Sequence, residues 1–290
     1  MLIGILNLIL SLLFFRSDFP AVSNPEVSFI KLNPAAETLE LGSERSVVFS
    51  VDNRIFLFTK EADEVQPIAS ITKLMTSLVF LDNNPGWEKI YKISARDEVK
   101  GGRLNLYPGD SVKIKDLFHT SLVASDNGAT LALVHATGLG ENEFVSRMNE
   151  KAAVFGLSRT KFVDPIGLGD GNVSTAREVA ILAQAAFRQE EISRATMKSE
   201  YVFLTVEGRE KKIESTDYLL FDSDNSFEVL GGKTGYTDSA GYCFVSLLQS
   251  HDGRKVISVV LNSDGKNNRF RDAKKSARWA LDSYIINNKK

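Results

Sequence analysis

The sequence predicts an α+β domain, in which an antiparallel sheet is flanked by helices and an inserted helical subdomain lies beside it. Strand-like runs occur near the start of the fold and again in the last third of the chain, whereas helical periodicity fills the middle. The 290 residues, of which 43% are hydrophobic and 25% charged, have the composition of a globular protein with a sizeable core.

The first 42 residues are expected to lie outside the domain. Residues 2–15 are almost all apolar, interrupted only by Asn7 and Ser11, and Arg16 follows them. This run is short for a membrane span but has the length of a signal-peptide core, although no Lys or Arg precedes it. We expect residues 1–23 to be a signal peptide or an N-terminal membrane anchor and residues 24–42 to be a linker; a buried N-terminal helix is the alternative.

The remaining residues, 43–290, are expected to form the domain, with the helical subdomain at about 75–190. The expected strands are residues 46–51, 55–58, 201–206, 228–234, 242–248 and 256–262. The expected helices are one that opens near Ile68, residues 114–124, 129–136, 141–155 and 175–188, and an amphipathic C-terminal helix marked by Phe270, Ala273, Ala277, Ala280, Leu281 and Tyr284. We expect the active site between the helices and the sheet.

Local signals set these boundaries. The first two strands flank Asp52-Asn53-Arg54, a pattern typical of a hairpin, and the last two are joined through His251-Asp252-Gly253-Arg254. The helix after Pro67 is expected to end at Asn83-Asn84-Pro85-Gly86. The next apolar helix breaks at Ser125-Asp126-Asn127-Gly128 and then resumes. The middle of the chain is therefore expected to be helical.

The net charge and the few Cys and His residues restrict the classes of function that the sequence can have. A formal net charge of -2 gives no basic field for nucleic acid. The single cysteine, Cys243, rules out an internal disulfide and lies in an apolar run typical of a buried thiol. His119, His135 and His251 form no close ligand pair, so the sequence predicts no metal site and no cofactor.

The stretch around Ser70 and Lys73 is where we expect the chemistry. Residues three apart on a helix share a face, so the Ser70 hydroxyl and the Lys73 ammonium can touch. A serine hydroxyl needs a base within hydrogen-bond reach, and a half-buried lysine near another cation can have its pKa lowered enough to serve. Ser-x-x-Lys occurs four times in the chain, and a solvated surface pair is the default for each. Only Ser70 begins a strongly apolar helix.

Lys233 begins a second motif, Lys233-Thr234-Gly235, at the end of an expected strand. An ammonium at a strand end beside glycines can approach another segment closely. There it would hold Lys73 deprotonated and attract an anionic substrate. A lysine on a solvated strand end is the alternative if this triplet stood alone.

The residues after Lys233 are suited to binding a peptide. Gly235 lets a ligand backbone lie along the strand edge. Thr234 can hydrogen-bond a substrate carboxylate, and the N–H of Tyr236 can complete an oxyanion hole with that of Ser70.

A third motif, Ser-Asp-Asn, occurs twice. The copy at residues 223–225 lies in a polar stretch typical of a loop tip, whereas the copy at residues 125–127 lies between two apolar helices that can hold it rigidly. We therefore select Ser125 to relay a proton between Lys73, Lys233 and the leaving group, and Asn127 to hold a substrate amide.

The order Ser-x-x-Lys, Ser-x-Asn, Lys-Thr-Gly resembles that of penicillin-binding proteins and serine β-lactamases. Three flanking stretches, residues 67–76, 164–168 and 232–242, are similar to the low-molecular-weight D-alanyl-D-alanine carboxypeptidases. Arg269-Phe270 at the start of the last helix is also similar to that family, whose arginine there helps bind the terminal carboxylate of the substrate. The resemblance covers about residues 47–284.

The resemblance implies the β-lactamase/DD-peptidase-like fold and a serine D-alanyl-D-alanine carboxypeptidase that acts through an acyl-enzyme on Ser70. It further implies peptidoglycan stem peptides ending in D-Ala-D-Ala as substrate, β-lactam antibiotics as covalent inhibitors, and an extracytoplasmic location. Relatives of this family often continue into a further domain and a membrane helix, so we expect any membrane tether to come from the N-terminus.

Three alternatives stay open. A DD-endopeptidase performs the same reaction on a longer substrate. A β-lactamase is favoured by Asp126 in the middle motif, but the chain lacks the Glu-x-x-Leu-Asn segment that carries the deacylating glutamate in class A enzymes. A non-catalytic cell-wall-binding module does not need Ser70 together with two lysines. Stem-peptide binding without D-alanine release would support the binding module, and rapid nitrocefin turnover the β-lactamase.

Overall fold

The computed structural model describes residues 29–31, 38–99, 105–223 and 226–286. The predicted signal peptide or anchor at residues 1–23 and most of the predicted linker lie outside the described residues. Among the described residues, no helix is both long and apolar enough to cross a membrane.

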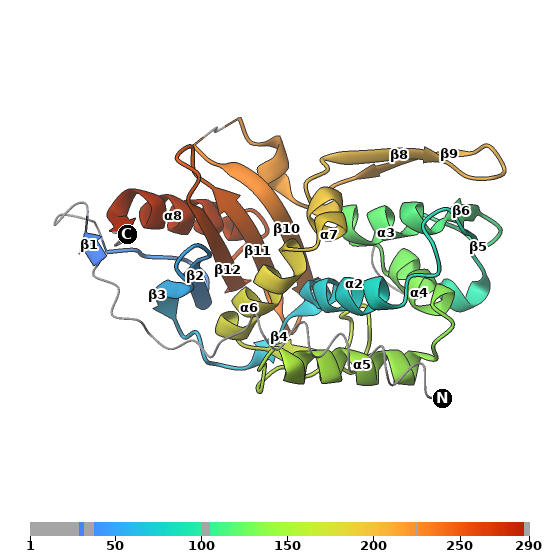
Figure 1. Ribbon diagram of the computed structural model, residues 1–290, viewed down its shortest axis with the longest axis horizontal. Helices are drawn as coiled ribbons and strands as arrows, with labels where there is room; N and C mark the ends of the chain where they lie inside the picture. Colours follow the sequence, from blue (N-terminus) through green and yellow to red (C-terminus); the bar gives the residue numbers. More distant parts are fainter. Residues whose placement is uncertain (1–28, 32–37, 100–104, 224–225, 287–290) are drawn as a thin grey trace.

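A five-stranded antiparallel sheet forms one part of the fold (Figure 1). In spatial order its strands are β10 (Glu228–Thr237), β11 (Gly241–Gln249), β12 (Lys255–Ser263), β2 (Arg45–Ser50) and β3 (Ile55–Lys60). The N-terminal hairpin joins the later strands through β2, where Val48 lies opposite Ser258 of β12. The predicted α+β class is confirmed, and β10, which carries Lys233, lies at the edge of the sheet.

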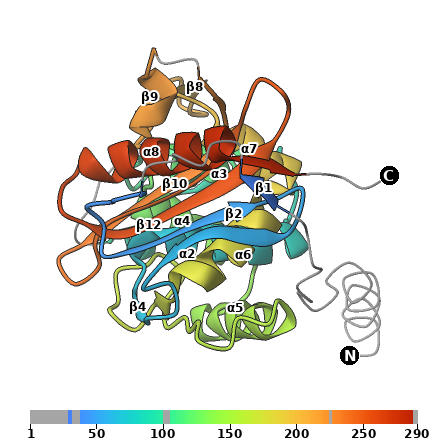
Figure 2. The same cartoon turned by 90° about the vertical axis from the view of Figure 1, so that its left-hand side faces the viewer.

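Helices cover both faces of this sheet (Figure 2). Helix α8 (Asn268–Ser283) packs against β11 and β12, where Phe270, Ala273 and Ala277 share a core with Phe244 and Val260. Helix α6 (Ala176–Phe187) packs on the other face, against β2, β11 and β12. Buried residues follow one another almost without a break along β2, β11 and β12, as expected of strands covered on both faces.

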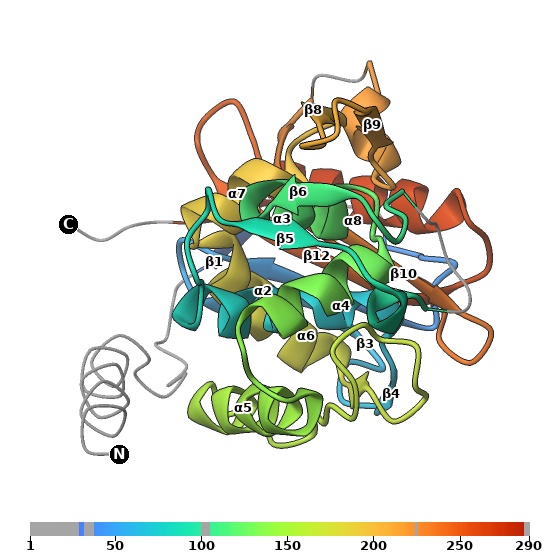
Figure 3. The same cartoon turned by 90° about the vertical axis from the view of Figure 1, so that its right-hand side faces the viewer.

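The second part of the fold is helical and is organised around α2 (Thr72–Asp82), which contacts α3, α4, α5 and α6 (Figure 3). Residues 72–80 of α2 are buried without interruption, as expected of a helix surrounded by other helices. The remaining helices are α3 (Ile114–Val123), α4 (Asn127–Ala136), α5 (Glu141–Val154) and α7 (Glu190–Thr196).

Short two-stranded pairs and 3-10 turns complete the described chain. The pairs are β1 (Phe29–Lys31) with β13 (Tyr284–Ile286), β4 (Gln66–Pro67) with β7 (Val173–Ser174), β5 (Ile90–Lys92) with β6 (Ser111–Lys113), and β8 (Glu200–Leu204) with β9 (Glu210–Glu214). The 3-10 turns are η1 (Ala69–Ile71), η2 (Ala95–Asp97) and η3 (Tyr218–Phe221).

Three local expectations differ from the structure. The helix expected near Ile68 begins instead at Thr72, after the tight turn η1. The C-terminal helix ends at Ser283, and Tyr284 begins β13, which pairs with a strand inside the stretch predicted as linker. The charged strand β9 was not predicted, because its stability comes from pairing with β8 and from tertiary contacts rather than from local propensity.

Candidate active site

The turn that carries Ser70 is held in a strained shape between two glycines. Ala69, immediately before Ser70, has a φ of 47°, in the left-handed region that costs a non-glycine residue energy. A Cβ on Gly167 would lie 2.1 Å from the Ala69 carbonyl oxygen, and one on Gly235 would lie 2.9 Å from the Ile68 oxygen. The glycines let a loop and the edge strand β10 approach the backbone of the turn directly, and Ser70 stays partly exposed between them.

Lys73 lies one turn into the helical segment and is fully buried. Its Nζ is 3.0 Å from Ser70 Oγ, 2.7 Å from Asn127 Oδ1 and 2.6 Å from the Ile166 carbonyl oxygen. Burial lowers the pKa of Lys73 to about 7, although the negative charges of Asp126 and Asp164 act to raise it. A large fraction of this amine is therefore neutral near pH 7.

The α3–α4 turn brings Ser125 and Asn127 to the same place. Ser125 has a φ of 59°, and the next residue, Asp126, caps helix α4 by accepting a hydrogen bond from the Ala129 N–H at 2.8 Å. Asn127 is thereby fixed as the first residue of α4, with its amide oxygen on Lys73. The middle residue of the motif serves to hold the other two.

Lys233 approaches from the sheet. Its Nζ donates to Ser125 Oγ at 2.8 Å and to the Thr234 carbonyl oxygen at 2.9 Å. Burial, together with the positive charges of Lys73 and Arg269, lowers the pKa of Lys233 well below its usual value, and Asp217 acts in the opposite direction. The structure therefore brings together Ser70, Lys73, Ser125, Asn127 and Lys233, which come from three separate segments.

The residues expected to bind substrate lie along and behind β10. Thr234 Oγ1 is 2.7 Å from Thr216 Oγ1, Gly235 lies against the Ser70 turn, and half of Tyr236 is exposed. Arg269 is buried behind the strand, where its Nη1 donates to the Gly235 carbonyl at 3.0 Å. Among the described residues, its Nε has no hydrogen-bond partner. In this structure Arg269 braces the backbone of the motif.

The loop that contains residues 164–168 completes the site. The Asp164 carboxylate accepts hydrogen bonds from the N–H groups of Ile166 and Gly167 at 2.8 and 2.6 Å and so presents the Ile166 carbonyl to Lys73. Asn172 was missed by the sequence analysis. Its Oδ1 accepts from Val163 N–H at 2.7 Å, and its Nδ2 donates to the hydroxyl of Thr72 at 3.1 Å. No local pattern distinguishes this asparagine from a surface one.

The arrangement suits acyl transfer, with an alcohol, two amines of lowered pKa and a second hydroxyl in one hydrogen-bonded group. Within the described ranges, no group of three His, Cys, Asp or Glu side chains could hold a metal ion. Cys243 is buried, and burial raises the pKa of its thiol to about 11, which keeps it protonated.

Comparison with known proteins gives a consistent result. Residues 33–265 match the family described as D-alanyl-D-alanine carboxypeptidase. The chain is 32% identical over 244 residues to a D-alanyl-D-alanine endopeptidase of Pseudomonas aeruginosa, covering 83% of this chain and 77% of that protein. It is 30% identical over 273 residues to the D-alanyl-D-alanine carboxypeptidase DacF of Bacillus subtilis, covering 85% of this chain and 64% of that one.

Solved structures agree with these sequence matches. Penicillin-binding protein D2 of Listeria monocytogenes in its cefotaxime-bound form is similar at a TM-score of 0.73 and 32% identity, covering 84% of this chain and 99% of that one. The Streptomyces K15 DD-transpeptidase is similar at a TM-score of 0.78 and 25% identity, with the same coverage.

Proposed function

Because this chain belongs to the D-alanyl-D-alanine carboxypeptidase family, we propose that it removes the terminal D-alanine from peptidoglycan stem peptides through an acyl-enzyme on Ser70. The observation that carries the proposal is the contact between Ser70 Oγ and the fully buried Nζ of Lys73, at 3.0 Å. A buried amine with a pKa near 7 is matched to general-base work at neutral pH.

The surroundings of Lys73 support its role as the base. A neutral amine has two N–H groups and one lone pair, and the Asn127 and Ile166 oxygens are two acceptors that can take the two hydrogens. The lone pair is then directed at Ser70 Oγ. On attack, the Ser70 oxygen forms a bond to the carbonyl carbon of the penultimate D-alanine while its proton passes to Lys73.

The next steps use the second hydroxyl. When the bond to the terminal D-alanine breaks, its nitrogen takes a proton from Ser125. Lys73 restores that proton by passing on the one it took from Ser70, either directly or by way of Lys233, which lies 2.8 Å from Ser125 Oγ. The negative oxygen of the intermediate is held by the N–H groups of Ser70 and Tyr236. Water then hydrolyses the ester, which regenerates the Ser70 hydroxyl and releases the shortened peptide.

The substrate is held by residues that surround Ser70. Thr234 and the edge of β10 receive the peptide and its terminal carboxylate, Asn127 holds a substrate amide, and Arg269 supplies positive charge from behind the strand. β-Lactams acylate the same serine.

A DD-endopeptidase is the second candidate. The relative from Pseudomonas aeruginosa carries that name, and the match spans 77% of it, against 64% of the carboxypeptidase DacF. Endopeptidase and carboxypeptidase differ only in the leaving amine, a cross-linked side chain in the first and free D-alanine in the second.

One experiment distinguishes a carboxypeptidase from an endopeptidase. The purified chain is incubated with a stem pentapeptide ending in D-Ala-D-Ala and, separately, with a cross-linked dimer, and the products are weighed by mass spectrometry. Release of D-alanine supports the carboxypeptidase, and cleavage of the dimer alone supports the endopeptidase. After penicillin treatment, an adduct on a serine other than Ser70 would refute the assignment, and no adduct would refute both readings.

We also propose an extracytoplasmic location, with export directed by residues 1–23 and the N-terminus either cleaved or retained as a tether. The apolar run at residues 2–15 and the cell-wall substrate support it. Fractionation of cells expressing the chain, followed by N-terminal sequencing, would test it, and recovery of the intact chain from the cytoplasm alone would contradict it.

A further inference from the structure

Asp126, the middle residue of the Ser125–Asn127 turn, is a fully buried carboxylate with three donors directed at it. One is the Ala129 N–H within helix α4. The other two come from a single distant residue, Asn105, whose backbone N–H and side-chain Nδ2 lie 2.9 and 2.8 Å from Asp126 Oδ2. A buried charge depends on such partners, because it has lost its hydration.

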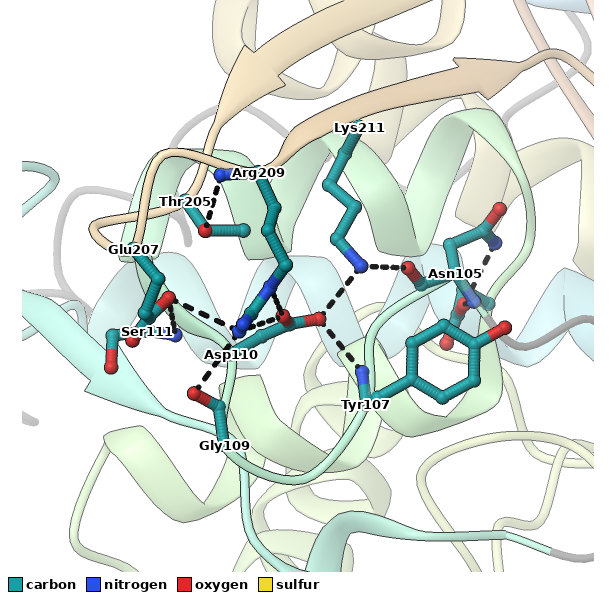
Figure 4. A network of polar contacts seen from close by, with 10 residues as sticks. Asn105, Tyr107, Gly109, Asp110, Ser111, Thr205, Glu207, Arg209 and Lys211 are labelled. Atoms are coloured by element: carbon teal, nitrogen blue, oxygen red, sulfur yellow. Dashed lines mark hydrogen bonds and ion pairs between the residues drawn. The ribbon is translucent and has the colours of Figure 1, made fainter.

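Asn105 is itself held by the tip of the β8–β9 hairpin (Figure 4). Lys211 Nζ donates to the Asn105 carbonyl at 3.2 Å and pairs with Asp110 Oδ2 at 2.8 Å. Arg209 Nε donates to Asp110 Oδ1 at 2.8 Å, and the Tyr107 N–H donates to Oδ2 at 2.9 Å. Burial acts to raise the pKa of Asp110, but these hydrogen bonds, that of Lys211 foremost, hold it below its usual value. Asp110 therefore stays ionised and anchors the hairpin to residues 105–110.

The base of the same hairpin reaches the site by a second route. Just after β9, the Thr216 N–H donates to the Val123 carbonyl at 3.0 Å, close to the Ser125 turn. Its hydroxyl lies 2.7 Å from that of Thr234, in the motif on β10. The tip of the hairpin is therefore connected to Asp126 through Asn105. Its base is connected to both the α3–α4 turn and the edge strand.

We propose that Asn105 is a positioning residue of the peptidase, held by Lys211, and that it sets the places of Ser125 and Asn127 through the carboxylate of Asp126. Asp110 acts on Asn105 only through its ion pair with Lys211. The inference rests on the proposed function, because it assigns Asn105 to the acylation step at Ser70. Asn105 touches neither Ser70 nor Lys73 in the contacts described, so it acts through Asp126.

Two features make the turn sensitive to this support. Ser125 has a left-handed backbone, a conformation that persists only when its surroundings enforce it. Its neighbour Asn127 accepts from Lys73 at 2.7 Å, so a displacement of the turn misplaces both the proton relay and the base. Shifts of about 1 Å in catalytic geometry can cost about 100-fold in rate.

The test measures acylation by a fluorescent penicillin in the full chain, with the limiting rate and the half-saturating concentration determined separately. Asn105→Ala removes the side-chain donor, and Lys211→Met removes the ammonium that holds Asn105. Lys212→Met is the matched control, because Lys212 is the next residue of the hairpin and pairs at 2.9 Å with exposed Glu200. Thermal melting of each variant is recorded alongside.

We expect Asn105→Ala to lower the limiting rate at least tenfold and Lys211→Met to lower it by about threefold to tenfold, with the half-saturating concentration within twofold of the parent. Lys212→Met should match the parent in both. A purely structural role would lower melting temperature while the folded fraction acylates at the parental rate, and that result would overturn the proposal.

Two other outcomes would also overturn it. An unchanged limiting rate with a raised half-saturating concentration would make Asn105 a ligand contact. If Asn105→Ala does not fold, the test rests on the other two variants. Equal limiting rates of acylation for Lys211→Met and Lys212→Met would then overturn the proposal. Absence of labelling in the parent is distinct from these, because it rejects the proposed function and the positioning role with it.

Discussion

The two buried lysines of the site come from different parts of the molecule and have different surroundings. Lys73, on the helical side, has two oxygens and a hydroxyl within 3.0 Å, and the charges of Asp126 and Asp164 act on it. Lys233, on the sheet, donates to Ser125 and to its neighbour's carbonyl, and the positive charges of Lys73 and Arg269 act on it.

This comparison shows that burial alone does not assign a lysine its role. Desolvation lowers the pKa of both amines, but acidic neighbours limit the fall at Lys73 to about 7, whereas cationic neighbours deepen it at Lys233. Lys73 is thereby suited to take a proton from Ser70. Lys233 is suited to pass one through Ser125 and to become charged when an anionic substrate arrives.

The largest expected effect separates the two amines directly. Lys73→Met should slow acylation by penicillin by about 10³-fold, equivalent to about 4 kcal/mol, because the general base is lost. Lys233→Met should cost about 10²-fold, since a relay can be bypassed by water more easily than a base. Stopped-flow acylation measures both, with exposed Lys92→Met as control. A larger loss at Lys233 would reverse the assignment.

The next effect tests the loop that supports Lys73. Gly167→Ala should destabilise the fold by about 3 kcal/mol, because the new Cβ would lie 2.1 Å from the Ala69 carbonyl at a φ of 83°. Gly208→Ala has a similar φ of 78°, and its Cβ would meet no described atom within 4 Å outside the adjacent residues. Its cost should therefore be only about 1 kcal/mol. Urea denaturation compares them, and equal losses would show that the close approach is not needed.

A third prediction concerns the acid beside Lys233. Burial raises the pKa of Asp217 to about 7, and its Oδ2 has no hydrogen-bond partner in the part of the chain that the structure describes. A carboxyl whose pKa is raised by folding binds its proton more tightly in the folded chain, so its stability contribution is present below about pH 4 and is lost as pH rises toward 7. Asp217→Asn should therefore gain about 2 kcal/mol relative to the parent between pH 5 and 7.

Melting temperatures across that range check the Asp217 prediction, with exposed Asp238→Asn as control. A difference between parent and Asp217→Asn that does not change with pH would contradict it.

The smallest expected effect tests how the neighbouring carboxylate of Asp126 acts on the pKa of Lys73. The charge of Asp126 raises the pKa of Lys73, so Asp126→Asn should lower that pKa and move the acid limb of the acylation profile to lower pH by about half a unit. The pH at the midpoint of the limb is compared rather than the maximal rate, because Asp126→Asn also weakens the hydrogen bonds that hold the Ser125–Asn127 turn. Asp63→Asn, at an exposed ion pair, should leave the limb in place. A limb that moved upward would exclude Lys73 as the titrating base.

Much of the fold could be predicted because its signals are local. The hairpin at β2–β3, the buried helix before Asn83 and the strands of the last third each carry their own periodicity and end at turn residues. The strand β9 carries no such signal, since its Glu and Lys residues are stabilised by pairing with β8.

In the candidate site, too, some residues could be predicted from local sequence and others could not. Ser70 with Lys73, Ser125 with Asn127, and Lys233 with Thr234 and Gly235 are visible as short motifs, because each pair must be held by one element at a fixed spacing. The supports of these motifs were not visible. Asn105, Asn172 and Asp217 are single polar residues in loops or turns, and only the tertiary contacts give them a role.

By itself the sequence determined which chemical groups are available and which element carries each, since spacing along a helix or strand is a property of the chain. Only the tertiary structure decided how close Ser125 lies to Lys233, how far each lysine's pKa falls, and where Arg269 points. The reason is physical. Burial and the charge of distant neighbours set these quantities, and both exist only when separate segments are packed together.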